Sequence, residues 1–206
     1  MKKLFSVIIS FFLVANCAFA VDYSKYNVSD INAIRKATKA YQNEFKNKKG
    51  TKEAEEEFLK FRDFYARVVM EQSEKIKINE PEQLYKDSYY WQARKYTEKY
   101  SVYGLKVNFN GEFYITTNME YLYMKFGPYL AEDLQELLMY NAILDSKAMY
   151  WDGAYSISKE ELLQIIEFYK NFNKKYPNSV HKQRVNEIIQ SYEKDLKTFP
   201  YINLNP

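Results

Sequence analysis

The sequence predicts a mainly α-helical protein: an irregular bundle of antiparallel helix pairs with one short β-hairpin at about residues 105–115. Three observations support this prediction. Several long segments carry apolar residues three and four positions apart, which is the period of an amphipathic helix. Five glycines and five prolines among 206 residues favour long regular elements over a loop-rich β-sandwich. The pair Asn110-Gly111 lies between two segments of alternating polarity, which is the strongest short-range signal of a hairpin.

Two helices are expected first, over residues 30–45 and 52–76. Ser29 is expected to cap the first helix, and Gly50 supplies the left-handed residue that follows it. The apolar face of the second helix consists of Ala54, Phe58, Phe61, Tyr65, Val68 and Val69. The carboxylates of its first turn are expected to be solvated, at an end where the helix dipole favours negative charge. They are Glu55, Glu56 and Glu57.

A third helix is expected after Asn79, and it contains an unusual density of aromatic residues. The stretch from 85 to 103 includes Tyr85, Tyr89, Tyr90, Trp91, Tyr96, Tyr100 and Tyr103. On a helix these side chains surround the cylinder, so they do not all face one core. Exposed tyrosine and tryptophan suit the recognition of peptides or sugars. The alternative is that they seal helix contacts on both sides.

Four more helices are expected after the hairpin, over residues 119–126, 129–151, 159–175 and 180–196. The clearest signal is "ISKEEL", in which Ser158 and Glu161 form a capping box. Ser179 is expected to cap the last helix.

The first 20 residues, "MKKLFSVIISFFLVANCAFA", predict a secretory signal peptide. Two lysines are followed by an apolar run, and "AFA" places small residues where a signal peptidase cleaves. We expect cleavage between Ala20 and Val21 and a secreted or periplasmic protein of the bacterial envelope. The apolar run is shorter than the about 20 residues of a membrane span, so no transmembrane helix is expected in the mature chain. Asn16 disfavours a lipid anchor at Cys17, because a small residue usually precedes a lipidated cysteine.

The mature chain, residues 21–206, is expected to form a single helical domain. The alternative division is N-terminal helices at 29–100 and a C-terminal part, hairpin plus helices, at 103–198. Removal of Cys17, the only cysteine, excludes disulfides, thiol nucleophiles and thiolate metal sites. Removing two of the 30 lysines and arginines leaves 28 basic and 27 acidic residues, a net charge near +1. This balance argues against a dedicated nucleic-acid-binding protein.

The motifs "GEFYI", "DGAYSIS" and "YPNS" occur in that order between residues 103 and 196. This stretch resembles an uncharacterised group of secreted bacterial proteins that place a "GEFYI" hairpin and a "DGA-x-x-I-S" turn before a "YPNS" helix pair. The pair itself is similar to the helix pairs of tetratricopeptide-like envelope proteins. The resemblance implies a secreted helical protein and supplies no established activity. Since "YPNS" occurs once, without a period near 34 residues, the sequence does not predict a repeat array.

Few residues suggest catalysis. The single histidine, His181, is expected to be exposed, and it lacks the partners of a zinc site or a Ser-His-Asp triad. We therefore assign no catalytic residue, metal or cofactor. Carboxylates near the hairpin and the "WDG" turn leave an acid–base hydrolase as the alternative, because glycosidases need two carboxyl groups about 5 to 10 Å apart. The candidates are Glu112, Glu132, Asp133 and Asp152.

The first hypothesis is a non-enzymatic, secreted or periplasmic protein that binds a protein or peptide partner of the cell envelope through an aromatic-rich surface. The alternative is an envelope hydrolase or small-ligand-binding protein that uses the carboxylates. The candidate binding residues are Trp91, Glu112, Tyr114, Tyr150, Trp151 and Asp152.

Overall fold

A computed structural model of the chain describes residues 21–79, 96–109, 113–147, 150–151, 154–155 and 157–198. Helices make up 74% of these residues, and a short antiparallel hairpin accompanies them, which confirms the predicted fold class. In the part of the chain described, no helix is both long and apolar enough to cross a membrane.

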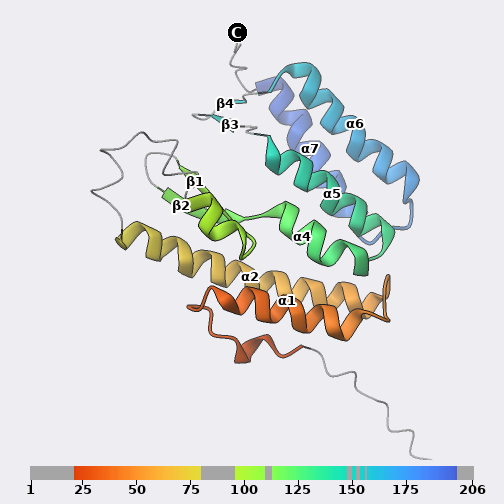
Figure 1. Cartoon of the computed structure of the whole chain (residues 1–206). Coiled ribbons are helices and arrows are strands. Elements are labelled where there is room, and N and C mark those ends of the chain that lie inside the picture. The colour runs from red at the N-terminus through yellow and green to blue at the C-terminus, as the bar shows by residue number, and fades with distance from the viewer. Residues whose placement is uncertain are drawn as a thin grey trace, which may run out of the picture.

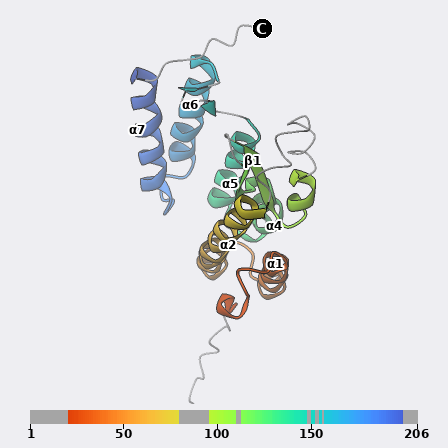
Figure 2. The same ribbon diagram turned by 90° about the vertical axis from the view of Figure 1, so that its left-hand side faces the viewer.

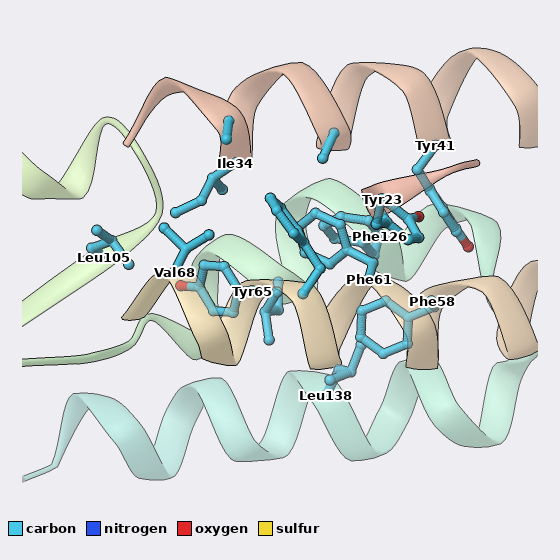
Figure 3. Packing of buried hydrophobic residues seen from close by; sticks show 14 of the residues in the cluster. Tyr23, Ile34, Tyr41, Phe58, Phe61, Tyr65, Val68, Leu105, Phe126 and Leu138 are labelled. Atoms are coloured by element: carbon cyan, nitrogen blue, oxygen red, sulfur yellow. The ribbon is translucent and has the colours of Figure 1, made fainter. Parts of the chain in front are cut away.

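The N-terminal part consists of two neighbouring helices, α1 (Asn32–Phe45) and α2 (Lys52–Asn79), with a short 3-10 turn, η1 (Tyr23–Lys25), below them (Figure 1). Their apolar faces meet as the periodicity predicts, and most of the buried side chains between them are aromatic (Figure 3). The Tyr41 hydroxyl donates a hydrogen bond to the carbonyl of Ala54 at 2.9 Å, which satisfies a polar group inside this core.

Ser29 does not cap α1. The helix begins without a side-chain cap at Ile31, and the Ser29 hydroxyl instead donates to Glu71 on α2 at 2.8 Å. The Asp30 carboxylate accepts from the backbone N–H of Asn32 at 2.9 Å. The predicted cap was therefore wrong. Ser29 binds Glu71 instead, a residue of α2 that lies 42 positions further along the chain.

The predicted hairpin is confirmed: β1 (Leu105–Phe109) pairs antiparallel with β2 (Phe113–Thr117). Its apolar face packs on α2, where the backbone N–H of Ile115 donates to the Ser73 hydroxyl at 3.1 Å. An isolated two-stranded hairpin is only marginally stable in water, and packing against α2 provides the additional contacts that it needs. Residues 96–101, just before the hairpin, are helical, which agrees with the end of the expected third helix.

Gly104 lies between that helical turn and β1, at a position that requires glycine. Its φ of +82° falls in the left-handed region. A Cβ atom there would come within 2.5 Å of the Tyr121 ring. The Tyr65 hydroxyl donates to the Gly104 carbonyl and accepts from the Asn118 N–H at 3.1 Å, so a single phenol connects both ends of the hairpin to α2.

The chain continues through α4 (Met119–Phe126), the 3-10 turn η2 (Gly127–Tyr129) and α5 (Glu132–Ser146) to the pair α6 (Lys159–Lys175) and α7 (Lys182–Thr198). Figure 2 shows α5 between α2 and the α6–α7 pair. Leu134 and Leu138 of α5 belong to the core around α2, whereas Leu137 and Leu144 belong to the core with α6 and α7. One helix therefore contributes to both hydrophobic cores.

The predicted end of α5 was wrong. The helix stops at Ser146, and Tyr150–Trp151 forms a strand, β3, that pairs with β4 (Ala154–Tyr155). The "ISKEEL" prediction is confirmed, because Ser158 and Glu161 exchange both hydrogen bonds of a capping box at the start of α6. Ser179 lies three residues before α7 and accepts from the backbone N–H of His181 at 3.1 Å.

Candidate functional site

The six binding residues predicted from the sequence are only partly described. Tyr114 lies on β2 opposite Asn108 and is half-buried. Tyr150 and Trp151 form β3. The remaining three, Trp91, Glu112 and Asp152, lie outside the described residues. An aromatic site made of these six residues stays a prediction.

Two of the carboxylates considered for a hydrolase have contacts to the corner between α6 and α7. Asp133 accepts a hydrogen bond from the Ser179 hydroxyl at 2.6 Å. Glu132 lies 3.6 Å from the Lys175 ammonium, and its side chain is 76% exposed. The neighbouring Glu136 accepts from Lys175 at 2.6 Å and from the Tyr176 hydroxyl at 2.8 Å. These contacts attach the "YPNS" corner to α5.

His181 is not the exposed histidine that the sequence suggested. Its side chain is 18% exposed, and its Nε2 lies 2.9 Å from Glu55 Oε1 on α2, although the geometry is not that of a hydrogen bond. The prediction that Glu55 and Glu57 are solvated was also wrong. Glu57 is buried and lies 3.1 Å from Lys60, whereas Glu56 is exposed as expected. The α6–α7 corner lies against Glu55, whereas Glu57 lies on the buried face of α2 near Tyr23.

The described surface has a groove between α1 and α4, with a volume of about 1000 Å³. Most of its wall comes from one face of α1. The contributing positions are spaced three and four apart, so they lie above one another along three turns of the helix. The residues of this "α1–α4 groove" are Asn32, Arg35, Lys36, Thr38, Lys39, Gln42, Asn43, Val102, Tyr121 and Lys125.

The α1–α4 groove is positively charged. Four of its side chains are cationic, Arg35, Lys36, Lys39 and Lys125, and none is acidic. Lys36 is neutralised by Asp30, at 3.1 Å from one carboxylate oxygen. Among the described residues, no carboxylate forms an ion pair with the other three cations. The groove therefore combines a concave shape with an excess of positive charge, which attracts anionic groups.

Contacts between α1 and α4 hold the floor of this groove in place. The hydroxyls of Thr38 and Tyr121 share a hydrogen bond of 2.8 Å. The Gln42 side-chain amide donates to the backbone carbonyl of Lys125 at 3.0 Å. Burial raises the pKa of the Tyr121 phenol, so its hydroxyl stays protonated and remains a hydrogen-bonding group at neutral pH. These bonds cross from one helix to the other, so the groove is formed before any ligand arrives.

The end of the tyrosine-rich segment borders the groove. Val102 lines it, and the guanidinium of Arg35 lies 6.0 Å from the centre of the Tyr103 ring. Tyr121 stands against Gly104, where only a residue without Cβ leaves room for its ring. The loop before β1 thus contributes apolar and aromatic surface beside the cations.

A second, smaller hollow of about 490 Å³ lies between α6 and α7. Its Lys170 is paired with Glu193 at 2.7 Å, so part of its charge is neutralised within the protein. For this reason the α1–α4 groove is the stronger candidate for binding.

The apolar face of residues 30–45 predicts the core contact of α1 but not the α1–α4 groove. A signal was present on the opposite face. Positions 32, 35, 36, 39, 42 and 43 are all basic or amide residues, without an acidic residue, in a protein with nearly equal numbers of acids and bases. Comparisons with models of protein families, with curated proteins and with solved structures found no match, so the proposals below rest on this geometry.

Proposed function

We propose that this chain is a non-enzymatic binding protein of the bacterial envelope, secreted or periplasmic, that binds a protein or peptide partner in the α1–α4 groove. The observation that carries the proposal is the groove itself: a preformed hollow between two helices, with three cations that have no carboxylate partner among the described residues. The signal-peptide pattern of residues 1–20 supports export.

The side chains of the groove are suited to binding rather than to bond cleavage. Its amides, ammonium groups and guanidinium donate hydrogen bonds and positive charge, and its one phenol is already bonded to Thr38. Glycoside hydrolysis needs paired carboxyl groups, and the groove contains none. Asp133, a candidate of the hydrolase alternative, is bonded to Ser179 at the helix corner.

A polymeric partner fits this groove better than a small molecule. Small-molecule sites are usually deep hollows of about 300–1000 Å³ that enclose most of the ligand. The α1–α4 groove has a volume at the upper end of this range, but it is an open groove along three turns of α1 and does not enclose its ligand. Tyr121 and Val102, which line the groove, supply the aromatic and apolar contacts that interfaces favour, and the Tyr103 ring lies beside Arg35.

Site-specific photo-crosslinking tests this proposal. A photoreactive amino acid is placed at Asn43, within the groove, or at Gln190, within the smaller hollow between α6 and α7, as the control, and the full chain is expressed in its native host. We expect one defined crosslinked protein from position 43, identified by mass spectrometry, and no such product from position 190. The same set of products from both positions, or no product from position 43, would argue against a partner in the groove.

A further inference from the structure

We propose that the occupant of the α1–α4 groove is an acidic peptide segment in an extended conformation. This inference rests on the proposed function and specifies the chemistry of the partner. It follows from the charge of the groove, from its length and from the side-chain amide of Asn43, which makes no hydrogen bond to the other described residues.

The charges point to carboxylates. Arg35 and Lys39 lie one turn apart on α1, and Lys125 faces them from α4. Two or three carboxylates spaced along one strand of peptide could meet all three cations, which lack an acidic partner within the described residues. The guanidinium of Arg35 is the strongest of these groups, because it can bind a carboxylate with two parallel hydrogen bonds.

The length of the groove corresponds to a short peptide. From Asn32 to Asn43 the helix advances eleven residues, or about 16 Å at 1.5 Å per residue. An extended peptide advances about 3.3 Å per residue, so about five residues cover that distance. Side chains of such a strand point alternately to opposite faces, so every second residue faces the cations.

The amides suit a peptide main chain. The Asn43 side chain makes no hydrogen bond to the other described residues, so its donor and its acceptor are both open to a ligand. A peptide bond offers the complementary carbonyl and N–H. Phosphate esters supply acceptors only, so they would bind the amide N–H groups of Asn43 but not its carbonyl oxygen.

Nucleic acids and membranes are less suitable partners. A nucleic-acid-binding domain usually carries a large excess of positive charge, whereas the formal net charge of the whole chain is only +3. A bilayer surface is broad and nearly planar, so it does not reach the floor of a groove between two helices. The groove gathers four cationic side chains within a small area, which favours a ligand of similar size to the groove.

Fluorescence anisotropy with defined peptides tests the inference. The full chain, purified from cells that express it, is titrated with fluorescein-labelled octaglutamate at low salt, beside octaglutamine and a single-stranded oligonucleotide of eight bases. We expect octaglutamate to bind at least about ten-fold more tightly than either competitor, and to lose most of its affinity at 0.5 M NaCl because salt screens these exposed charges. Equal or tighter binding of the oligonucleotide would overturn the assignment to a peptide.

A pair of charge reversals locates the binding. Lys39→Glu replaces an attraction in the groove by a repulsion, and it should weaken octaglutamate binding about ten-fold, as a change near 1.4 kcal/mol would. Lys194→Glu, on the exposed face of α7, changes the net charge equally and should alter the affinity less than two-fold. If Lys39→Glu changes the far-ultraviolet circular dichroism, Lys125→Glu, from the other wall, takes its place. Equal effects of the groove and control reversals would contradict the proposal.

The two proposals can fail separately. If crosslinking from Asn43 captures a partner while octaglutamate does not bind, the partner is not recognised as an acidic segment, and only the present inference is lost. If crosslinking fails and octaglutamate binds without sensitivity to Lys39→Glu, the groove is not the binding site, and both proposals are lost.

Discussion

Gly104 illustrates how one residue determines the shape of the groove. It has a left-handed backbone conformation, and its missing Cβ leaves the space that the Tyr121 ring fills. Tyr121 in turn shares a hydrogen bond with Thr38 on α1. A side chain at position 104 would therefore strain the backbone and displace a residue of the groove floor.

We expect Gly104→Ala to lower the free energy of unfolding by about 2–4 kcal/mol, since it combines a left-handed alanine with overpacking. Gly50→Ala is the matched control, because Gly50 also has a positive φ, of 70°, but a Cβ atom added there would meet no other atom within 4 Å. It should cost only about 1 kcal/mol. Urea unfolding followed by circular dichroism measures both values. Similar losses for the two variants would show that the contact with Tyr121 is unimportant.

His181 and Glu55 show what a sequence does not reveal about individual residues. Glu55 belongs to an acidic run in the first turn of a predicted helix, a position that is usually solvated. His181 has no obvious partner near it in the sequence. They meet because the corner before α7 packs against the start of α2, more than 120 residues away in the chain. Charged residues at helix starts are exposed by default, and only tertiary packing changes this.

At the scale of elements, local signals predicted most of the fold. The capping box of "ISKEEL" gave the start of α6, and Asn-Gly gave the β1–β2 hairpin, because both features depend on residues only a few positions apart. The short β3–β4 pair was missed, since two residues per strand are too few for a periodic pattern. The α1–α4 groove was missed because the polar face of α1 was not considered, and because Val102, Tyr121 and Lys125 reach it from other segments of the chain.

The capping box of α6 leads to a prediction about pH. The backbone N–H of Ser158 donates to Glu161, and this hydrogen bond, with help from Lys147, holds the pKa of that carboxyl below its ordinary value of 4.5. A lowered pKa means that the charged form stabilises the folded state. This stabilisation is complete above pH 4.5 and is lost as the pH falls through the lowered value.

Glu161→Gln should therefore lower the melting temperature at pH 7, and the difference from the unmodified protein should shrink at pH 3. Ser158→Ala removes the other half of the box, which carries no charge, so its effect should persist at both pH values. Thermal unfolding at pH 7 and pH 3 tests both variants. An equal effect of Glu161→Gln at the two pH values would show that its charge contributes nothing.

For the whole molecule, α5 is the element that unites the fold. Leu138 packs in the core with Phe58 and Phe61 (Figure 3). Its neighbour Leu137 packs in the core with α6 and α7. Because both cores need the same helix, neither can lose α5 without weakening the other. We therefore expect the two cores to unfold together.

Leu138→Ala should lower the free energy of unfolding by about 2–5 kcal/mol, the usual cost of a cavity in a buried core. The stability of α6 should fall with that of α2, although Leu138 belongs only to the core around α2. Hydrogen exchange measured by mass spectrometry at increasing urea follows both helices in one experiment. Loss of protection in α2 with unchanged protection in α6 would mean that the cores are independent.

The overall charge of the molecule is small, whereas the lining of the α1–α4 groove contains four cationic side chains and no acidic one. The groove is held by bonds between α1 and α4, and three of its four cations have no carboxylate partner among the described residues. The proposed binding depends on this property: the bonds that join the two helices do not use these cationic side chains, which stay available to a ligand.

Two-dimensional NMR of the isotope-labelled chain during titration with octaglutamate tests that property most directly. We predict that the amide signals that shift are those of residues 32–43 on α1 and those around Lys125 on α4, with octaglutamine causing no comparable change. Shifts centred on the hollow between α6 and α7, or no shifts on α1 at saturating peptide, would contradict it.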